Sequence, residues 1–311
     1  MLRLAMSSHA ETFERVRDPL AERGIEVAHL QPKERAIRLT DDPDTDRRAD
    51  PTDAADYDVG FVYPSRLMEG AALDARLSIP WVNGRDAVLT SRNKAGVIAR
   101  LDAAGVPVPK TTLISNPADE STVVEAASDF SYPVVVKPNS ATRGVGVATA
   151  TDLDSLLGVV DYLDLVHDFR ATGDKSYLLQ EFLPDAHDYR AMVVDGEFAG
   201  AVERRLPDDA LATGRWKHNV HRGAEATGVD LPERHRRLAE RAADVLDIDY
   251  LGVDLLETDD RLVVNETNAR PTVDAATKYE PGFYDRLANL IRETAADSAD
   301  SKGPDDHAPG A

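Results

Sequence analysis

Two carboxylates and one amide lie close together in the segment 252–268, GVDLLETDDRLVVNETN. A tight turn near Asp259 would fold this segment into a two-stranded hairpin and bring Asp254 roughly opposite Glu266. Because side chains alternate along a strand, Glu266 and Asn268 share one face, and no lysine is expected near enough to neutralise the two carboxylates. Such oxygen donors bind hard divalent cations, which are completed by water and nucleotide phosphates. The pattern predicts a metal site; the alternative is an exposed hairpin with polar residues facing water.

A lysine ends an apolar strand in the segment 134–147, VVVKPNSATRGVGV. Lys137 is costly to bury unless it meets an anion, and Gly144 and Gly146 would let the loop backbone approach a phosphate. The residue order is not that of a P-loop, and no G-x-G-x-x-G follows a strand here. Glycine hairpin loops are common, so this segment alone is weak evidence for a phosphate site. The evidence is stronger because the segment precedes the hairpin that carries Asp254.

Polar residues also end the apolar strand LLQEF at 178–182. Gln180, Glu181 and the backbone around Phe182 could hydrogen-bond an adenine edge in an apolar slot. This segment therefore favours a nucleotide site.

The segment D-Y-R at 188–190 places Asp188 and Arg190 on the same face of a strand. Arg190 can bind a phosphate or a carboxylate with two parallel hydrogen bonds. Taken alone, however, the segment is better explained by a cross-strand ion pair.

A cluster of hydrogen-bond donors occupies the segment 216–223, WKHNVHRG, with Lys217, His218, Asn219, His221 and Arg222. Its two histidines could be metal ligands, but the cations Lys217 and Arg222 would oppose a metal ion. A phosphoryl group in transfer needs such donors to spread its charge. The cluster therefore favours an anion site.

The elements that must position these residues alternate between strands and helices. The first part of the chain has short buried strands separated by helices, as in a small α/β layer, and its acidic, proline-rich segment 40–58 is predicted to be an exposed loop. Helices are predicted over 87–104 and over 116–130, the second with Asn116 as its N-cap. The pattern predicts a hairpin over 189–204 around the Asp-Gly turn, and strands over 250–257 and 262–268.

Composition limits the classes of function. The 311 residues include 36 Lys plus Arg against 56 Asp plus Glu, a net charge of -20. This acid excess repels phosphate backbones and anionic membranes, so neither a nucleic-acid nor a membrane partner is expected. The chain has no cysteine, which excludes disulfides, thiolate metal sites and a cysteine nucleophile.

The surface charge and the first residues bear on location. Only eight basic residues are lysine, and we interpret an acidic, lysine-poor surface as adaptation to a salt-rich, halophilic cell; a surface that meets a basic partner is the alternative. The opening residues contain no sustained apolar run, and no apolar stretch reaches membrane-spanning length. We therefore expect a cytoplasmic protein.

These motifs, in this order, resemble the ATP-grasp superfamily and, within it, the glutamate ligases that modify ribosomal protein S6 (the RimK type). The resemblance rests on S-R-N-K at 91–94, V-V-V-K-P at 134–138, the glycine loop 140–147, Q-E-F at 180–182, D-Y-R at 188–190, N-V-H-R-G at 219–223, G-V-D at 252–254 and N-E-T-N at 265–268. It implies an N-terminal α/β domain followed by a two-subdomain α+β ATP-grasp fold. The implied boundaries are 1–89 for the first domain, 90–175 for the central subdomain, 176–294 for the C-terminal subdomain, and 295–311 for a disordered acidic tail.

The resemblance also implies residue roles. ATP would lie between the two subdomains, bound by Lys94, Lys137, Gly144, Gly146, Gln180, Glu181, Phe182 and Asp188. The ligands of two Mg²⁺ or Mn²⁺ ions would be Asp254, Glu266 and Asn268. The γ-phosphate and the substrate carboxylate would meet Arg190, Lys217, Asn219 and Arg222. The chain departs from the family at N-V-H-R-G-A, where a second glycine is usual, and at N-A-R-P, 268–271, where Arg270 could itself bind a carboxylate.

The implied activity is that of an ATP-dependent carboxylate–amine ligase. ATP converts a carboxylate to an acyl phosphate and an amine displaces the phosphate, which needs no covalent protein nucleophile and agrees with the lack of cysteine and of a Ser-His-Asp pattern. The expected substrates are glutamate or a similar amino acid and an acceptor carboxylate on a small molecule or a protein tail. Alternatives are an amino-acid-carrier-protein, dipeptide or cofactor ligase, a kinase, or a non-catalytic ATP-binding module. Such ligases often form homo-oligomers, so self-assembly stays open.

Overall fold

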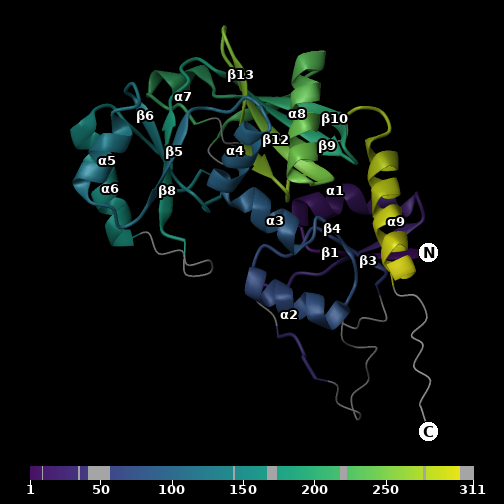
Figure 1. The fold of residues 1–311 in the computed structure, drawn as a ribbon. Helices are drawn as coiled ribbons and strands as arrows, with labels where there is room; N and C mark the ends of the chain where they lie inside the picture. Colours follow the sequence, from purple (N-terminus) through teal and green to yellow (C-terminus); the bar gives the residue numbers. More distant parts are fainter. Residues whose placement is uncertain are drawn as a thin grey trace. The chain divides into compact units, whose positions relative to one another are not determined.

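The chain folds into two compact units, which are described one at a time (Figure 1). The structure is a computed structural model, and it describes residues 1–8, 10–33, 36–40, 57–142, 144–166, 174–217, 223–275 and 278–301. The first unit comprises residues 1–88, 270–276 and 281–311, and the second comprises 89–269 and 277–280.

The first unit is built on a parallel sheet of order β2-β1-β3-β4. Its elements are β1 (Leu2–Met6), α1 (Ala10–Ala21), β2 (Ile25–His29), β3 (Val59–Phe61), α2 (Leu67–Leu77), β4 (Trp81–Val82) and α9 (Phe283–Ser301). The strands are short; β3 is fully buried and β1 is buried over Leu4–Met6, whereas in β2 only Ile25 is buried. Most of the predicted exposed loop, residues 41–56, lies outside the described residues.

Helix α9 changes the predicted boundaries. The sequence assigns it to the C-terminal subdomain, whereas its contacts lie in the first unit, where Asp285 pairs with Arg23 and the Tyr284 hydroxyl donates to the Arg15 carbonyl. The helix also includes residues 295–301, the start of the predicted disordered tail, and Ala295 and Ala296 favour this extension. Residues 302–311 lie outside the described residues.

The second unit begins within α3 (Arg85–Arg92) and continues with α4 (Lys94–Ala103). The sequence predicts one helix here, but Asn93 interrupts it because its side chain accepts a hydrogen bond from the Gly96 backbone and caps α4. The predicted helix over 116–130 is shorter in the structure, α5 (Glu120–Ala127), and its N-cap is Asp119 instead of Asn116.

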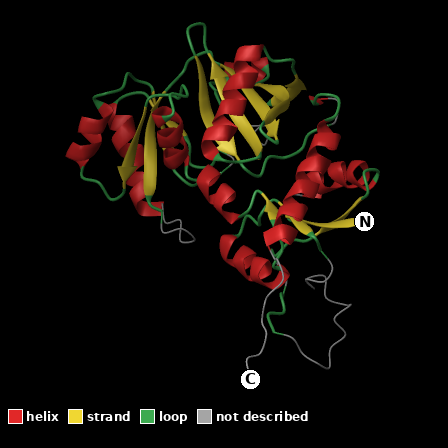
Figure 2. Ribbon diagram, turned by 45° about the vertical axis from the view of Figure 1, so that its right-hand side comes forward, coloured by secondary structure: helices red, strands yellow, loops and turns green. Residues whose placement is uncertain are grey.

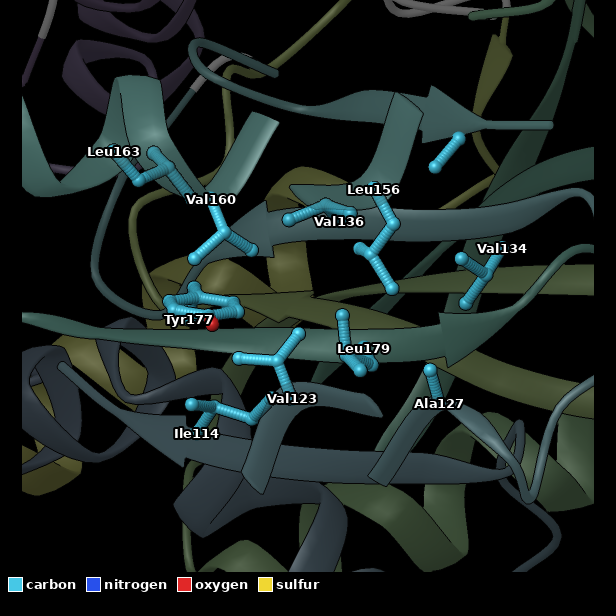
Figure 3. Packing of buried hydrophobic residues seen from close by; sticks show 11 residues of the cluster. Ile114, Val123, Ala127, Val134, Val136, Leu156, Val160, Leu163, Tyr177 and Leu179 are labelled. Carbon is cyan, nitrogen blue, oxygen red and sulfur yellow. The ribbon is translucent and has the colours of Figure 1, made fainter. Parts of the chain in front are cut away.

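The first sheet of the second unit is antiparallel, with the order β5-β8-β6-β7. Its strands are β5 (Thr111–Ser115), β6 (Val134–Pro138), β7 (Ala148–Ala150) and β8 (Ser176–Glu181). One face packs on α5 and α6 (Leu153–Val166), and Figure 3 shows the core, in which Val134, Val136, Tyr177 and Leu179 meet residues of both helices. Because side chains alternate, Val135, Lys137 and Gln180 project from the other face.

The second sheet of this unit is also antiparallel, with the order β11-β10-β9-β12-β13. Its elements are β9 (His187–Val194), β10 (Glu197–Arg205), α7 (Asp208–Ala212), β11 (Glu225–Gly228), α8 (Glu233–Leu246), β12 (Tyr250–Glu257) and β13 (Leu262–Asn268). Helix α8 lies along β9, β10 and β12 (Figures 1 and 2), and His235 on α8 contacts the Tyr189 ring edge-to-face. The face opposite α8 is therefore the one that Asp188 and Arg190 share.

The three sheets confirm the predicted fold class, an α/β domain followed by two α+β subdomains. Among the described helices, none has an apolar stretch long enough to cross a membrane.

Candidate active site

The hairpin β12–β13 brings together the predicted metal ligands. Asp254 lies directly opposite Glu266, as predicted, and Gly252 lies opposite Asn268. The register shifts by one residue after Asp254, so that Asn265 is the extra residue of a β-bulge. Because Asp254 lies opposite both Arg190 and Glu266, both carboxylates lie on the sheet face opposite α8.

Two arginines share the carboxylate of Asp254. Arg190 lies opposite it on β9, and its Nε and Nη2 atoms donate to Oδ1 and Oδ2 at 2.7 and 2.8 Å. Nη2 of Arg204 lies 3.0 Å from Oδ2 of Asp254, and the same guanidinium donates from Nε to Oδ1 of Asp188 at 2.8 Å. We call these four side chains, Asp188, Arg204, Asp254 and Arg190, the Asp–Arg row; its two positive and two negative charges balance.

The row stays ionised because its members are paired. Burial opposes ionisation of Asp254, but the charges of Arg190 and Arg204 outweigh it and lower the pKa of Asp254 to about 2. Burial also acts to lower the pKa of Arg204, whereas Asp254 and Asp188 raise this pKa above its usual value. Asp254 and Arg204 are thus both charged at neutral pH, although each side chain is only 8% exposed.

Arg204 is a site residue that the sequence predictions do not include. The Asp-Gly turn pairs Val194 with Glu197, and a regular hairpin would then set Asp188 opposite Glu203. A register shift between Phe198 and Gly200 sets it opposite Arg204 instead. A glycine inside an apolar strand is a known signal of a bulge, so Gly200, with φ 133°, is the feature that could have indicated it.

The expectation that no lysine lies near the carboxylates is wrong. Nζ of Lys94 lies 3.3 Å from Oε1 of Glu266 and also donates to the Ala141 carbonyl. Lys94 is the first residue of α4, which packs against β13, and the sequence separation hides this contact. The Lys94 side chain is 7% exposed and that of Glu266 is 36% exposed, so Glu266 can still meet a ligand.

Lys137 is a buried cation on the face of β6 that points away from the α5–α6 core. Burial lowers its pKa to about 8, although the nearby charges of Glu266 and Asp254 act in the opposite direction. No ion pair joins Lys137 to a carboxylate among the described residues. An anion that enters this site would supply the missing negative charge.

The glycine loop and Lys217 lie together. Gly144 and Gly146 have φ values of 66° and 73°, which favour glycine, and a Cβ on Gly146 would come within 2.7 Å of the Pro138 ring. The ammonium of Lys217 donates to the carbonyl of Val147 at the end of this loop. The predicted phosphate loop thus contacts the first residue of the predicted donor cluster.

Gln180 and Glu181 point to opposite faces of β8. Gln180 lies on the face of Lys137 and donates to Oγ1 of Thr111 at 2.8 Å. The Glu181 carboxylate accepts from the Lys110 backbone N–H at 2.7 Å and lies 2.8 Å from Nη2 of Arg261. Of these two side chains, that of Gln180 therefore shares a face with Lys137 and that of Glu181 does not.

Phe182 follows β8 and contacts the Trp216 ring edge-to-face, with the centroids 5.7 Å apart. Trp216 in turn lies under the Lys217 ammonium, at 5.5 Å. The end of the predicted adenine segment thus meets the start of the donor cluster through two aromatic rings.

The remaining predicted site residues are Asn219, Arg222 and Arg270. Asn219 and Arg222 lie outside the described residues. Arg270 belongs to the first unit, where its guanidinium donates to the carbonyls of Ser7, Val62 and Tyr63. Its predicted contact with a substrate carboxylate stays a prediction.

The donors of the hairpin fit a divalent cation that a nucleotide completes. Among the described residues, no group of three or more His, Cys, Asp or Glu side chains is arranged to hold a metal ion. Asp254, Glu266 and Asn268 offer two carboxylates and one amide on one face, which leaves positions for water and phosphate oxygens, as Mg²⁺ prefers. A carboxylate has about four lone-pair sites, so Asp254 can accept from its arginines and still bind a cation.

Comparison with known proteins agrees with this chemistry. The profile of the RimK-like ATP-grasp domain matches residues 91–282. A probable alpha-L-glutamate ligase of Enterobacter sp. (strain 638) is 31% identical over 199 residues, 63% of this chain and 62% of the relative. The ribosomal protein bS6–L-glutamate ligase of Escherichia fergusonii is 30% identical with the same coverage, and human N-acetylaspartylglutamate synthase A is 32% identical over 197 residues, 62% of this chain and 47% of the relative. The chain thus spans about three fifths or less of the length of these relatives.

Solved structures show the same fold. D-alanine–D-alanine ligase from Bacillus anthracis superposes with a TM-score of 0.67 at 16% identity and covers 97% of this chain and 100% of its own. The D-cycloserine synthetase DcsG superposes with a TM-score of 0.71 at 20% identity and covers 94% and 99%. These likenesses confirm the predicted ATP-grasp fold, a parallel α/β sheet plus two antiparallel-sheet subdomains.

Proposed function

Because the chain belongs to the RimK-like ATP-grasp family, whose ligases are ATP-dependent and form carbon–nitrogen bonds, we propose that it joins an amino acid to an acceptor carboxylate. The amino acid is glutamate or a similar one, and the acceptor is a small molecule or a protein tail. The reaction proceeds through an acyl phosphate and consumes ATP with two Mg²⁺ or Mn²⁺ ions.

One observation carries this proposal: buried cations and oxygen donors for a cation meet at the same hairpin. Lys94 pairs with Glu266, and the charge of Lys137 interacts with Glu266 and Asp254. A bare anion would repel the carboxylates and a bare cation would repel the lysines. A polyphosphate with its divalent cation satisfies both, which supports a metal–nucleotide complex as the ligand.

The residues divide the chemistry between them. Asp254, Glu266 and Asn268 would hold the divalent cation, which when bound neutralises phosphate charge and polarises the γ-phosphoryl group. Lys94 and Lys137 bind the phosphates, and the glycine loop and Lys217 contact them. Gln180 and the segment after it border the adenine.

Two transfers follow. An acceptor carboxylate oxygen attacks the γ-phosphorus and ADP leaves, while Arg190 and the predicted donors Lys217, Asn219 and Arg222 stabilise the charge on the phosphoryl and carboxylate oxygens. Arg204 joins this set from the Asp–Arg row. The amine then attacks the acyl carbon, loses its proton and expels phosphate, which leaves an amide. The protein contributes position and electrostatics, and no covalent nucleophile is needed.

The test is to measure ADP and phosphate release with Mg²⁺, with and without pools of amino acids and of peptide, carrier-protein and cofactor acceptors. We expect release that requires both an amino acid and an acceptor. Phosphate retained on the product would instead indicate a kinase, and release that never depends on either substrate would contradict a ligase. Running each assay at low and high KCl also tests the predicted salt adaptation.

A further inference from the structure

Asp188 and Arg204 form a buried ion pair at one end of the Asp–Arg row. Their side chains are 11% and 8% exposed. Arg204 donates to Oδ1 of Asp188 from both Nε and Nη2. The sequence predictions place Asp188 at the nucleotide, whereas in the structure its carboxylate binds this arginine.

We propose that Asp188 is a positioning residue, which orients the guanidinium of Arg204 towards an oxyanion in the active site. This inference rests on the proposed ligase function, since the oxyanion is a phosphoryl or acyl-phosphate oxygen of that reaction. Asp188 itself touches no substrate in this scheme; it acts through Arg204.

The geometry of the guanidinium supports this role. The edge formed by Nε and Nη2 faces Asp188, and Nη2 also reaches Asp254 at 3.0 Å. Among the described residues, no hydrogen-bond partner is found for Nη1, so its two N–H groups remain for a ligand. Because the guanidinium is planar and rigid, fixing one edge also fixes the direction of Nη1.

Asp254 cannot provide the same control. Both of its oxygens already accept from Arg190, and it holds Arg204 through one contact. Asp254 is also a predicted metal ligand, so its charge must be shared with a cation. Asp188 accepts from two nitrogen atoms of Arg204 and therefore sets its orientation.

The bulge in β10 makes this pair possible. The shift between Phe198 and Gly200 turns Arg204 to the face of Asp188. The backbone N–H of Glu280 donates to the Ala199 carbonyl at 3.1 Å, and a Cβ on Gly200 would come 2.7 Å from the Cα of Tyr279. The segment 278–280 thus packs against the bulge and holds the register.

Glu203 offers a matched control on the same strand. It is the neighbour of Arg204 but points to the opposite face, where it pairs with His187 at 3.0 Å and Arg205 at 2.8 Å. Glu203→Gln therefore removes an ion-paired carboxylate next to Arg204 without touching the Asp–Arg row.

The test is a double-mutant cycle of Asp188→Asn and Arg204→Gln, read as kcat and KM for ATP in the ligase assay. We expect Arg204→Gln to lower kcat by about 100-fold and Asp188→Asn by about 10-fold, with KM for ATP changed less than about threefold. The double variant should match Arg204→Gln alone in kcat, because the proposed effect of Asp188 on turnover is exerted through Arg204. Glu203→Gln should retain kcat within about twofold, as expected of a change away from the site.

Two results would overturn the proposal. One is a double variant whose kcat falls by the full product of the single effects, which would mean that Asp188 acts independently of Arg204. The other is a loss in Glu203→Gln equal to that in Asp188→Asn. If Asp188→Asn does not fold, as judged by its thermal unfolding midpoint, Asp188→Glu replaces it: the charge is kept but displaced by one methylene, and kcat should still fall.

Failure of the proposed ligase function can be distinguished from failure of the inference about Asp188. If the wild-type protein shows no substrate-dependent ADP release, the ligase proposal fails, and the same cycle is read by calorimetric titration with Mg²⁺ and a non-hydrolysable β,γ-imido analogue of ATP. Non-additive losses of affinity would then still support the coupling of Asp188 to Arg204. Additive losses would reject it.

Discussion

The two sheets of the second unit differ in whether their buried charged side chains form ion pairs. On the sheet that contains β12, the Asp–Arg row pairs each buried carboxylate with an arginine, and the pKa of Asp254 falls to about 2. On the sheet that contains β6, Lys137 is buried without an ion pair among the described residues, and its pKa falls to about 8. One sheet is balanced before a ligand arrives and the other is not, so the second gains most from an incoming polyanion.

Asp254→Asn should have the largest effect, because it removes a predicted metal ligand and also breaks the row. We expect ligase turnover to fall at least about 100-fold. The free energy of unfolding should fall by up to about 3 kcal/mol, since Arg204 stays buried and Arg190 half-buried with less compensation. Steady-state assays and urea unfolding measure the two effects; unchanged stability would mean that the row does not hold the sheet together.

Glu266→Gln should separate catalysis from folding. Glu266 is more exposed than Asp254 and pairs only with Lys94 among the described contacts, so the free energy of unfolding should change by no more than about 1 kcal/mol. Turnover should fall about 100-fold, because an amide is a poorer ligand for Mg²⁺ than a carboxylate. Turnover equal to that of the wild-type protein at saturating Mg²⁺ would refute the metal assignment of Glu266.

Lys137→Met, unlike Asp254→Asn, should not lower the free energy of unfolding. The substitution replaces a buried lysine that has no ion pair among the described residues with an uncharged side chain of similar shape. The free energy of unfolding of the ligand-free protein should therefore stay the same or rise, by up to about 3 kcal/mol, as the lowered pKa of Lys137 indicates. Affinity for the Mg²⁺ complex of ATP should fall about 10-fold or more. The control is Lys110→Met, an exposed lysine before β5 whose ammonium contacts the Asp129 carbonyl and the Phe130 ring; it should leave the affinity unchanged and change the free energy of unfolding by no more than about 1 kcal/mol. A Lys137→Met protein that is destabilised without nucleotide would break the comparison between the sheets.

The pH dependence of nucleotide affinity should show the smallest effect. Burial lowers the pKa of Lys137 to about 8, so in the free protein the ammonium is present below this pH and is lost as the pH rises through it. Affinity for the Mg²⁺ complex of ATP should therefore decline above about pH 8, towards a 10-fold loss per pH unit. Calorimetric titrations between pH 7 and 9.5 measure this, and Lys137→Arg should abolish the decline, since arginine stays protonated. A flat profile in the wild-type protein would contradict it.

Local patterns were read correctly where neighbouring residues decide the structure. The strands β12 and β13 have the predicted bounds, and the pairing of Asp254 with Glu266 is the predicted one. A hairpin with a short turn is stabilised by contacts close in sequence, so alternation and turn residues suffice to predict it.

The predictions were incomplete where distant segments meet. The contact of Lys94 with Glu266 depends on the packing of α4 against β13, and the pairing of Asp188 with Arg204 depends on a bulge that the segment 278–280 contacts. A shift of one residue in register reverses the face to which every later side chain points. Neither the packing nor the shift can be derived from local propensity.

The sequence by itself determined which chemical groups this protein carries and in what order: two lysines beside apolar strands, a glycine loop, and a hairpin with two carboxylates and an amide. The tertiary structure decided which charges neutralise one another. It paired Asp254 with two arginines, brought Lys94 to Glu266, left Lys137 buried without an ion pair in the described region, and engaged Arg270 with backbone carbonyls of the first unit. The physical reason is that a residue's type follows from the sequence, whereas the field at a charge depends on its burial and on partners that only the folded chain brings within a few ångströms.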